Sequence, residues 1–468
     1  MNNKSPETAV NPESSNDVKP ENKMGYMPIN KLLLTMSIPM IISMTVQACY
    51  NIVDSIFVAQ ISENALTAVS MAFPIQNLLI SVAVGVGVGI NALMSRSLGE
   101  KKFDYANKIA MQGLFINIVG YLLFLIIGVF GTHLYMTSQT DIAEIIQLGD
   151  TYTMICCVAS LGVFIQITFE RYLLSTGKTL LAMFVQGLGA VVNIILDPIL
   201  IFGWFGLPAM GVAGAALATV IGQFCAAGLA IFINHKYNRE IKLHKKDFIP
   251  DWKVIKPILA IGIPSILMSS IGSIMTFGMN KILMAFTPTA VAVFGIYFKL
   301  QSFFCMPVFG LNNGVVPIIA YNYGAQNRTR MNKAIKLAVI YAVVIMLIGF
   351  ATFQIIPREL LLMFDASNEM LEIGIPALRI ITLNFLVAGF CIMAISVLQA
   401  LGYSMYSLYI SVARQLVVLL PAAFTLAQFG NLNLVWWSFP IAESVTIVLS
   451  AFYLKRALSK LHWGPETK

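Results

Sequence analysis

The chain has 468 residues, of which 58% are hydrophobic and 11% are charged, and its formal net charge is +8. This composition, with a mean hydropathy of +0.79, excludes a soluble globular protein and predicts a polytopic membrane protein. The positive charge does not indicate nucleic-acid binding, because the basic residues gather in short loops between apolar segments, as membrane topology requires.

Residues 1–31 are rich in Asn, Ser, Pro, Glu and Lys and predict a disordered cytoplasmic tail. The tail has no short apolar core with a small-residue cleavage site, so no signal peptide is evident. Twelve apolar segments follow, each long enough to span a bilayer. They run over residues 32–58, 65–95, 105–132, 147–174, 179–204, 208–234, 254–284, 290–320, 332–356, 373–400, 404–428 and 432–454.

Lysine and arginine are unevenly distributed among the loops between the segments. They cluster after the second, sixth, eighth and last segments, whereas residues 59–64 and 133–146 contain none. The positive-inside rule therefore predicts that both termini lie on the cytoplasmic side of the cell inner membrane. A polar linker at 235–253 separates an N-lobe at 32–234 from a C-lobe at 254–457, and 458–468 forms a second cytoplasmic tail.

The two halves resemble each other at a constant offset of 225 residues. The matching pairs include Phe73-Pro-Ile-Gln76 with Phe298-Lys-Leu-Gln301, Ile38-Pro39 with Ile263-Pro264, and Gly85, Gly89 and Gly99 with Gly310, Gly314 and Gly324. Each half has six segments, so both halves begin on the same side of the membrane. We therefore predict an all-α membrane protein of two parallel six-helix repeats, an arrangement in which transporters bind their substrate between the halves.

Two acids lie within the apolar segments of the first half. Asp197 follows Asn193 by four residues, so the two share a helix face, and a charge at a membrane-helix centre costs roughly 2.5–3.5 kcal/mol. Asp54 and Asp197 lie roughly 33 Å and 26 Å along their outward-running helices, so both belong to the outer half of the membrane. Thr219, on the next helix, can reach the same depth.

These acids have no counterpart in the second half, where the aligned positions lie near Met279-Asn280 and at Ala422. A structural carboxylate common to the fold should occur twice, whereas a cation site needs to occur only once. We therefore favour a cation or proton site over a carboxylate that merely satisfies a neighbouring helix.

Other charged residues allow two interpretations each. Glu170 lies near the cytoplasmic end of its segment, where an inner gate or a salt bridge with Arg171 or Lys178 is as well supported as a coupling role. Glu443, at mid-membrane, is either a second proton or substrate group or a hydrogen-bonded carboxylate. Lys299 and Arg414 are expected near cytoplasmic helix ends, where long side chains reach the interface.

The sequence contains no complete motif for enzymatic chemistry. Gly177-Lys178-Thr179 resembles the end of a phosphate-binding loop, but the glycine required five residues earlier is Tyr172. No hydrolase triad or metalloprotease signature occurs, and the cysteines have no metal-ligand spacing with histidine. We expect no enzyme and no resident cofactor.

Several stretches together resemble the multidrug and toxic compound extrusion (MATE) family. They are Tyr50-Asn-Ile-Val-Asp54, Ser95-Arg-Ser-Leu-Gly-Glu100, Asn193-Ile-Ile-Leu-Asp-Pro198 and Gly211-Val-Ala-Gly-Ala-Ala-Leu-Ala-Thr219. Two more, Pro317-Ile-Ile-Ala-Tyr-Asn-Tyr-Gly324 and Ile441-Ala-Glu-Ser444, are similar to its MepA-type bacterial branch.

The resemblance implies a V-shaped, two-lobe antiporter that works as a monomer in membrane lipid. Such a protein exports cationic or amphipathic drugs in exchange for protons or sodium, with no other cofactor. The family's N-lobe cation site maps onto Asp54, Asn193, Asp197 and Thr219.

Three alternative functions each require a different sequence feature. A lipid-linked-precursor flippase of the same superfamily should have basic residues in its central cavity. A nutrient symporter of the other twelve-helix type should have a Gly-Asp-Arg-type loop after the second segment. A non-transporting scaffold or receptor would not need paired acids at matched depth.

Overall fold

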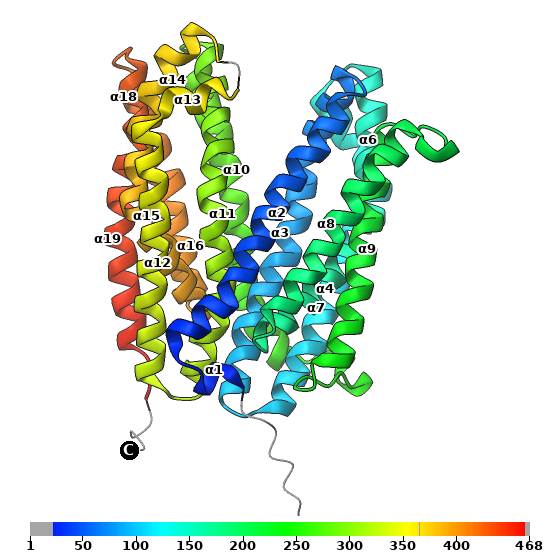
Figure 1. The fold of residues 1–468 in the computed structure, drawn as a ribbon, viewed down its shortest axis with the longest axis vertical. Helices are drawn as coiled ribbons and strands as arrows, with labels where there is room; N and C mark the ends of the chain where they lie inside the picture. Colours follow the sequence, from blue (N-terminus) through cyan, green and yellow to red (C-terminus); the bar gives the residue numbers. More distant parts are fainter. Residues whose placement is uncertain (1–21, 365, 464–468) are drawn as a thin grey trace, which may run out of the picture.

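The structure is a computed structural model that describes residues 22–364 and 366–463, and within this part of the chain every regular element is helical (Figure 1). The first half contains α1 (Lys23–Tyr26), α2 (Ile29–Ala59), α3 (Glu63–Gly99), α4 (Phe103–Phe130), α5 (Thr132–Gln139), α6 (Ala143–Val158), α7 (Leu161–Ser175), α8 (Thr179–Phe202), η1 (Trp204–Gly206) and α9 (Val212–Tyr237). The linker holds η2 (Lys245–Phe248). The second half contains α10 (Trp252–Met284), α11 (Pro288–Gly324), α12 (Arg328–Ile355), α13 (Pro357–Leu362), α14 (Asn368–Ile381), η3 (Thr382–Asn384), α15 (Phe385–Ala400), α16 (Ser404–Val412), η4 (Ala413–Leu419), α17 (Leu420–Ala427), α18 (Leu432–Trp436) and α19 (Ser438–Ser459).

Eleven helical stretches of the described chain are long and apolar enough to cross a membrane, and the bent pair α6–α7 makes a twelfth. The pair is bent by 44°. At the break, the Ser160 hydroxyl donates a 2.7 Å hydrogen bond to the Cys157 carbonyl oxygen, a local bond that competes with the helical ladder. The twelve predicted spans are therefore confirmed.

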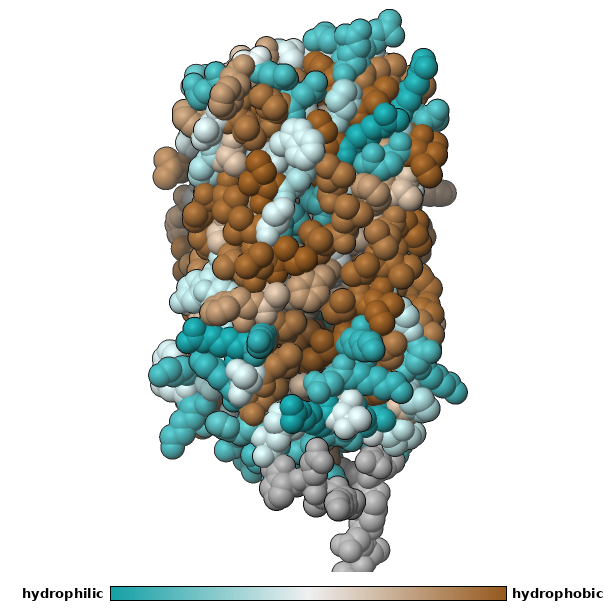
Figure 2. All heavy atoms as spheres, turned by 90° about the vertical axis from the view of Figure 1, so that its left-hand side faces the viewer, coloured by the Kyte–Doolittle hydropathy of each residue, from teal (hydrophilic) through white to brown (hydrophobic). Residues whose placement is uncertain are grey.

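The helices form two lobes, α2–α9 and α10–α19, which approach each other at one end and diverge at the other (Figure 1). We call the near end, where α1 and the last turn of α19 lie, the basal end, and the far end the open end. On the face of the second lobe in Figure 2, hydrophobic residues form a broad middle band, and hydrophilic residues gather toward both ends. This pattern suits a protein that spans a bilayer.

The repeat predicted from the sequence is confirmed by the helix bounds. α3 and α11 begin and end 225 residues apart, and so do α4 and α12. The lobes also meet through equivalent contacts: Gly85 of α3 packs against Ile266 of α10, and Gly310 of α11 packs against Ile41 of α2. Each glycine is needed because an added Cβ would collide with the facing helix.

Helix α2 belongs to both lobes. Its basal half packs on α11, where Ser37 lies against Gly314, while its outer half carries Asp54 to the first lobe. Pro39 lies inside the helix between these regions and supplies no backbone donor. A change at the outer half of α2 can therefore reach the contact between the lobes.

Residues 22–31 are ordered, so the prediction of disorder over 1–31 is wrong for this part; residues 1–21 lie outside the described chain. Met24 is fully buried, and the Nη2 atom of Arg330 donates to the carbonyl oxygens of Met24 (3.1 Å) and Met27 (2.7 Å). On the other side, the Nδ2 atom of Asn22 donates to the carbonyl oxygen of Thr176 (3.1 Å) and to Oε2 of Glu240 (2.8 Å). The segment thus ties both lobes together at the basal end.

Candidate cation-coupling site

The four residues predicted for a cation site come together in the first lobe. Asp54 lies on α2, Asn193 and Asp197 lie on α8, and Thr219 lies on α9. Asn193 is 2% exposed and Asp197 is fully buried, whereas Asp54 and Thr219 are partly exposed. The site is therefore closed on the side of α8 and accessible from α2 and α9.

Asn193 connects the site across two helices. With its amide oriented to satisfy both neighbours, Nδ2 donates to Oδ2 of Asp197 at 3.0 Å. Its Oδ1 then accepts from the Thr219 hydroxyl at 3.1 Å and from the Thr219 backbone N–H at 3.0 Å. This network fixes one oxygen of Asp197 and leaves the other to face a ligand.

The carboxyl groups of Asp54 and Asp197 interact directly with each other. The Oδ1 atom of each is buried and has no hydrogen-bond partner among the described residues. Two adjacent carboxylates repel each other in a medium of low dielectric constant, so they favour sharing a proton or binding a cation between them. Oxygen atoms from carboxylates, an amide and a hydroxyl also suit a hard cation such as sodium.

Four further side chains border the site, and none of them was among the predicted site residues. The Tyr50 hydroxyl hydrogen-bonds with Thr219. The Nε2 atom of Gln76 donates to the Tyr152 hydroxyl at 3.1 Å and to Sγ of Cys156 at 3.3 Å. Gln76 had a sequence signal, since it matches Gln301 in the repeat, but nothing in the sequence pointed to Tyr152.

Glu170 is buried on α7, apart from these four residues. It accepts a 2.5 Å hydrogen bond from Nε2 of Gln186, whose Oε1 accepts from the Ser43 hydroxyl on α2. Within the described chain the expected salt bridge is absent, because Arg171 donates to Oδ1 of Asn313 on α11 at 3.1 Å and Lys178 pairs with Glu240. Glu170 is therefore connected through Gln186 to Ser43 of α2.

Glu443 lies in the second lobe and forms an ion pair with Arg414, with Oε2 of the acid 2.9 Å from Nε of the base. The expectation that Arg414 lies near a helix end is wrong. It lies ten residues past the start of α16 at Ser404, or about 15 Å along the helix, and its side chain points to Glu443. The carboxylate of Glu443 is thus already neutralised by the protein.

Lys299 also lies away from its expected place. α11 begins at the open end, and Lys299 is eleven residues from Pro288, its first residue. Its ammonium group lies 6.0 Å from the ring centroid of Phe364, which follows α13 at the open end. Lys299 therefore extends toward the open end rather than the basal end.

Two parallel six-helix repeats, closed at one end and holding a pair of acids within one lobe, define a membrane transporter of the two-lobe class. The profile of the MatE family matches residues 39–199 and 264–425, and the chain belongs to this family.

The relatives agree with this assignment. The chain is 27% identical over 434 residues to a protein of Staphylococcus haemolyticus (strain JCSC1435) named multidrug export protein MepA, covering 92% of this chain and 95% of the relative. It is 26% identical over 419 residues to the Staphylococcus aureus (strain MRSA252) protein of the same name, covering 89% and 92%.

Solved structures share the fold. One, described as MATE in complex with MaL6, has a TM-score of 0.88 at 24% identity and covers 94% of this chain and 98% of its own. Another, described as the outward-facing conformation of a multidrug resistance MATE family transporter, has a TM-score of 0.87 at 24% identity with the same coverage.

Proposed function

We propose that this protein is a secondary active efflux antiporter that exports cationic or amphipathic compounds in exchange for protons or sodium ions. The observation that carries the proposal is the direct contact of Asp54 and Asp197, each with one buried oxygen that has no partner among the described residues. The names of the relatives, multidrug export proteins, support the class of substrate.

Helix α2 links cation binding to the arrangement of the lobes, because it contacts both of them. A proton or sodium ion that enters from the open end binds between Asp54 and Asp197 and reduces the charge of the pair by one, and this relieves their repulsion. Asp54 lies on the same helix as Ser37 and Ile41, which pack against α11 of the other lobe. Bending or straightening of α2 near Pro39 then alters the basal contact, so the loaded and unloaded sites favour different arrangements of the lobes.

The driving force is sufficient for drug accumulation. Each net elementary charge that moves inward per transport cycle across 100 mV releases about 2.3 kcal/mol, enough for a concentration ratio of roughly fifty. The charged groups of the site are acidic, which suits a cationic substrate and coupling ion better than the anionic head group that a lipid-linked-precursor flippase would carry.

The membrane setting completes the proposal. Basic residues at the basal end, such as Lys101, Lys102 and Lys246, support a cytoplasmic position for that end and for both termini, with the open end facing outward. We assign the protein to the inner membrane, where one copy contains both lobes and the complete site.

The test is transport in proteoliposomes under an imposed proton or sodium gradient, with a fluorescent cationic dye as substrate. Asp54→Asn and Asp197→Asn should each abolish gradient-driven dye movement, because neither variant can form the charged pair. Asp141→Asn, which changes an exposed acid at the open end, is the matched control and should transport normally. Unchanged gradient-driven transport by Asp197→Asn would overturn the proposal.

A further inference from the structure

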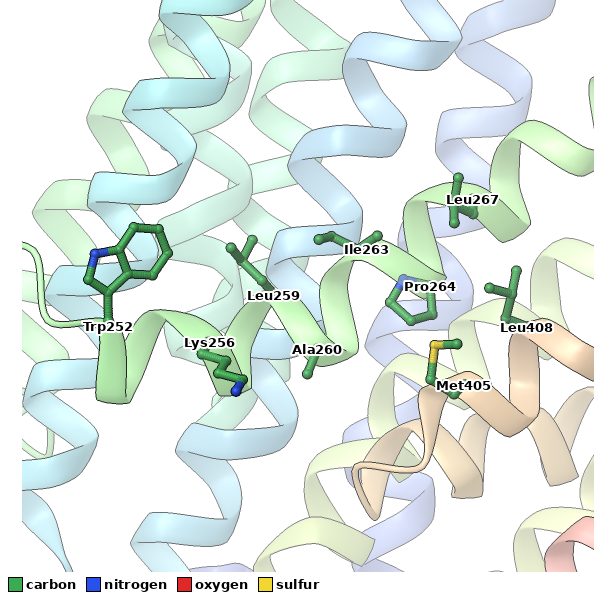
Figure 3. Close-up of a pocket in the computed structure, with 9 residues that line it drawn as sticks. All are labelled: Trp252, Lys256, Leu259, Ala260, Ile263, Pro264, Leu267, Met405 and Leu408. Atoms are coloured by element: carbon green, nitrogen blue, oxygen red, sulfur yellow. The ribbon is translucent and has the colours of Figure 1, made fainter.

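A groove of about 580 Å³ runs between α10 and α16 in the basal half of the second lobe (Figure 3). Its lining is apolar except at one end, where Trp252 and Lys256 lie. The lining residues are Trp252, Lys256, Leu259, Ala260, Ile263, Pro264, Leu267, Met405 and Leu408.

The groove is open at the surface. Trp252 is 71% exposed, Ile263 is 49% exposed and Met405 is 46% exposed, although all three are large and hydrophobic. Exposed apolar side chains on membrane-spanning helices are stable only against hydrocarbon. The occupant of the groove must therefore be apolar along most of its length.

The length of the groove fits one leaflet. From Trp252 to Leu267 the groove follows 15 residues of α10, which is about 22 Å along the helix. Half of a bilayer's hydrocarbon core is about 15 Å thick, so this distance extends from the head-group region into the acyl region. Trp252 is the first residue of α10, and tryptophan is enriched at such ends of membrane-spanning helices; Lys256 lies one turn further along the helix.

The charge at the mouth selects the head group. Lys256 forms no ion pair with an acid of the described chain, and Lys253, Lys245 and Lys246 lie in the same basal stretch. The two acids of this stretch, Asp247 and Asp251, line a separate pocket with Lys108 and Gln112 of α4, and the Asp251 carboxylate accepts from the Lys253 backbone N–H at 3.0 Å. The net charge near the mouth of the groove is therefore positive, as it is in basic pockets that bind acidic lipids.

We propose that this groove is a binding site for an anionic phospholipid of the basal leaflet. One acyl chain lies along Ile263, Leu267 and Leu408, and the phosphate lies beside Lys256. The site is separate from Asp54 and Asp197, so the inference stands whether or not the proposed transport activity is correct.

Trp252 provides the assay, because acyl chains brominated near the head group quench indole fluorescence on contact. The full chain is reconstituted in nanodiscs that contain the same mole fraction of brominated phosphatidylglycerol or brominated phosphatidylcholine. The signal of Trp252 is the difference between the wild type and Trp252→Phe. We expect phosphatidylglycerol to quench this signal about twofold more than phosphatidylcholine.

Two pairs of variants decide the result. Lys256→Gln should remove the preference for phosphatidylglycerol, whereas Lys253→Gln, which removes the same charge outside the groove lining, should retain it. Ala260→Phe should fill the groove and reduce quenching by both lipids, whereas Ile274→Phe, at a 54% exposed position elsewhere on α10, should not. Equal quenching of the wild type by the two lipids, or equal effects of Lys253→Gln and Lys256→Gln, would overturn the proposal.

Discussion

Gly99, at the end of α3, packs against the end of α11, and Gly324, at the end of α11, packs against the end of α3. An added Cβ on Gly99 would collide with the carbonyl oxygen of Tyr321, and one on Gly324 would collide with the carbonyl oxygen of Arg96. Both glycines and both carbonyl groups are 225 residues apart, so the contact is reciprocal, as in a symmetric dimer. The two halves of this chain therefore close the basal end as two copies of one ancestor would.

Gly324→Ala should force α3 and α11 apart at this contact. A methyl group has no space beside the Arg96 carbonyl group, and overpacking of this kind costs about 1–3 kcal/mol. We expect a lower melting temperature and a several-fold lower rate of dye efflux in cells. Gly295→Ala is the control, since it lies on the same helix with nothing within 4 Å of the new Cβ. Equal behaviour of the two variants would mean that this contact does not govern closure.

Thr219→Ala should weaken the coupling site without unfolding the lobe. It removes the hydroxyl that donates to Asn193 at 3.1 Å and hydrogen-bonds with Tyr50, and each such bond contributes about 0.5–1.5 kcal/mol. We expect the cation concentration for half-maximal dye efflux to rise about two- to tenfold in proteoliposomes. Thr219→Ser keeps the hydroxyl and should remain near the wild type; a similar loss in both variants would point to the lost methyl group instead.

The sequence was sufficient for the spans, the repeat and the meeting of Asp54 with Asp197, because these depend on helix length, a fixed offset and depth along a helix. It was insufficient for Arg414, because its partner Glu443 lies on a helix that only tertiary packing brings close. The order of residues 22–31 was missed for a similar reason. A polar stretch predicts disorder, but Met24 is buried by helices distant in sequence.

Arg330→Ala should loosen α1 from the basal end. Arg330 binds the carbonyl groups of Met24 and Met27, and the Met24 carbonyl has a second donor, Nδ2 of Asn322, at 3.2 Å. Backbone amides at 23–27 should exchange hydrogen at least about tenfold faster, as measured by mass spectrometry, since local opening follows the contacts that are lost. Arg328→Ala is the control, because Arg328 lies over the Trp463 ring instead. Unchanged exchange in Arg330→Ala would show that the hydrogen bonds of Asn22 and Asn322 are sufficient to hold the segment.

The Arg414–Glu443 pair distinguishes a structural carboxylate from a coupling carboxylate. Removing one partner of a buried ion pair leaves an uncompensated charge and costs about 3–5 kcal/mol, whereas replacing both partners with apolar residues is often nearly neutral. Arg414→Leu should therefore lower the melting temperature in detergent strongly, and the double variant Arg414→Leu with Glu443→Leu should recover most of that loss. The Oε1 atom of Glu443 has no partner among the described residues, so some of the cost persists in the wild type and the recovery can be complete.

If Glu443 only balances Arg414, the stable double variant should also transport dye under a proton or sodium gradient. If the double variant is stable but transports no dye, Glu443 takes part in coupling or substrate binding, and the second lobe contributes to exchange along with Asp54 and Asp197.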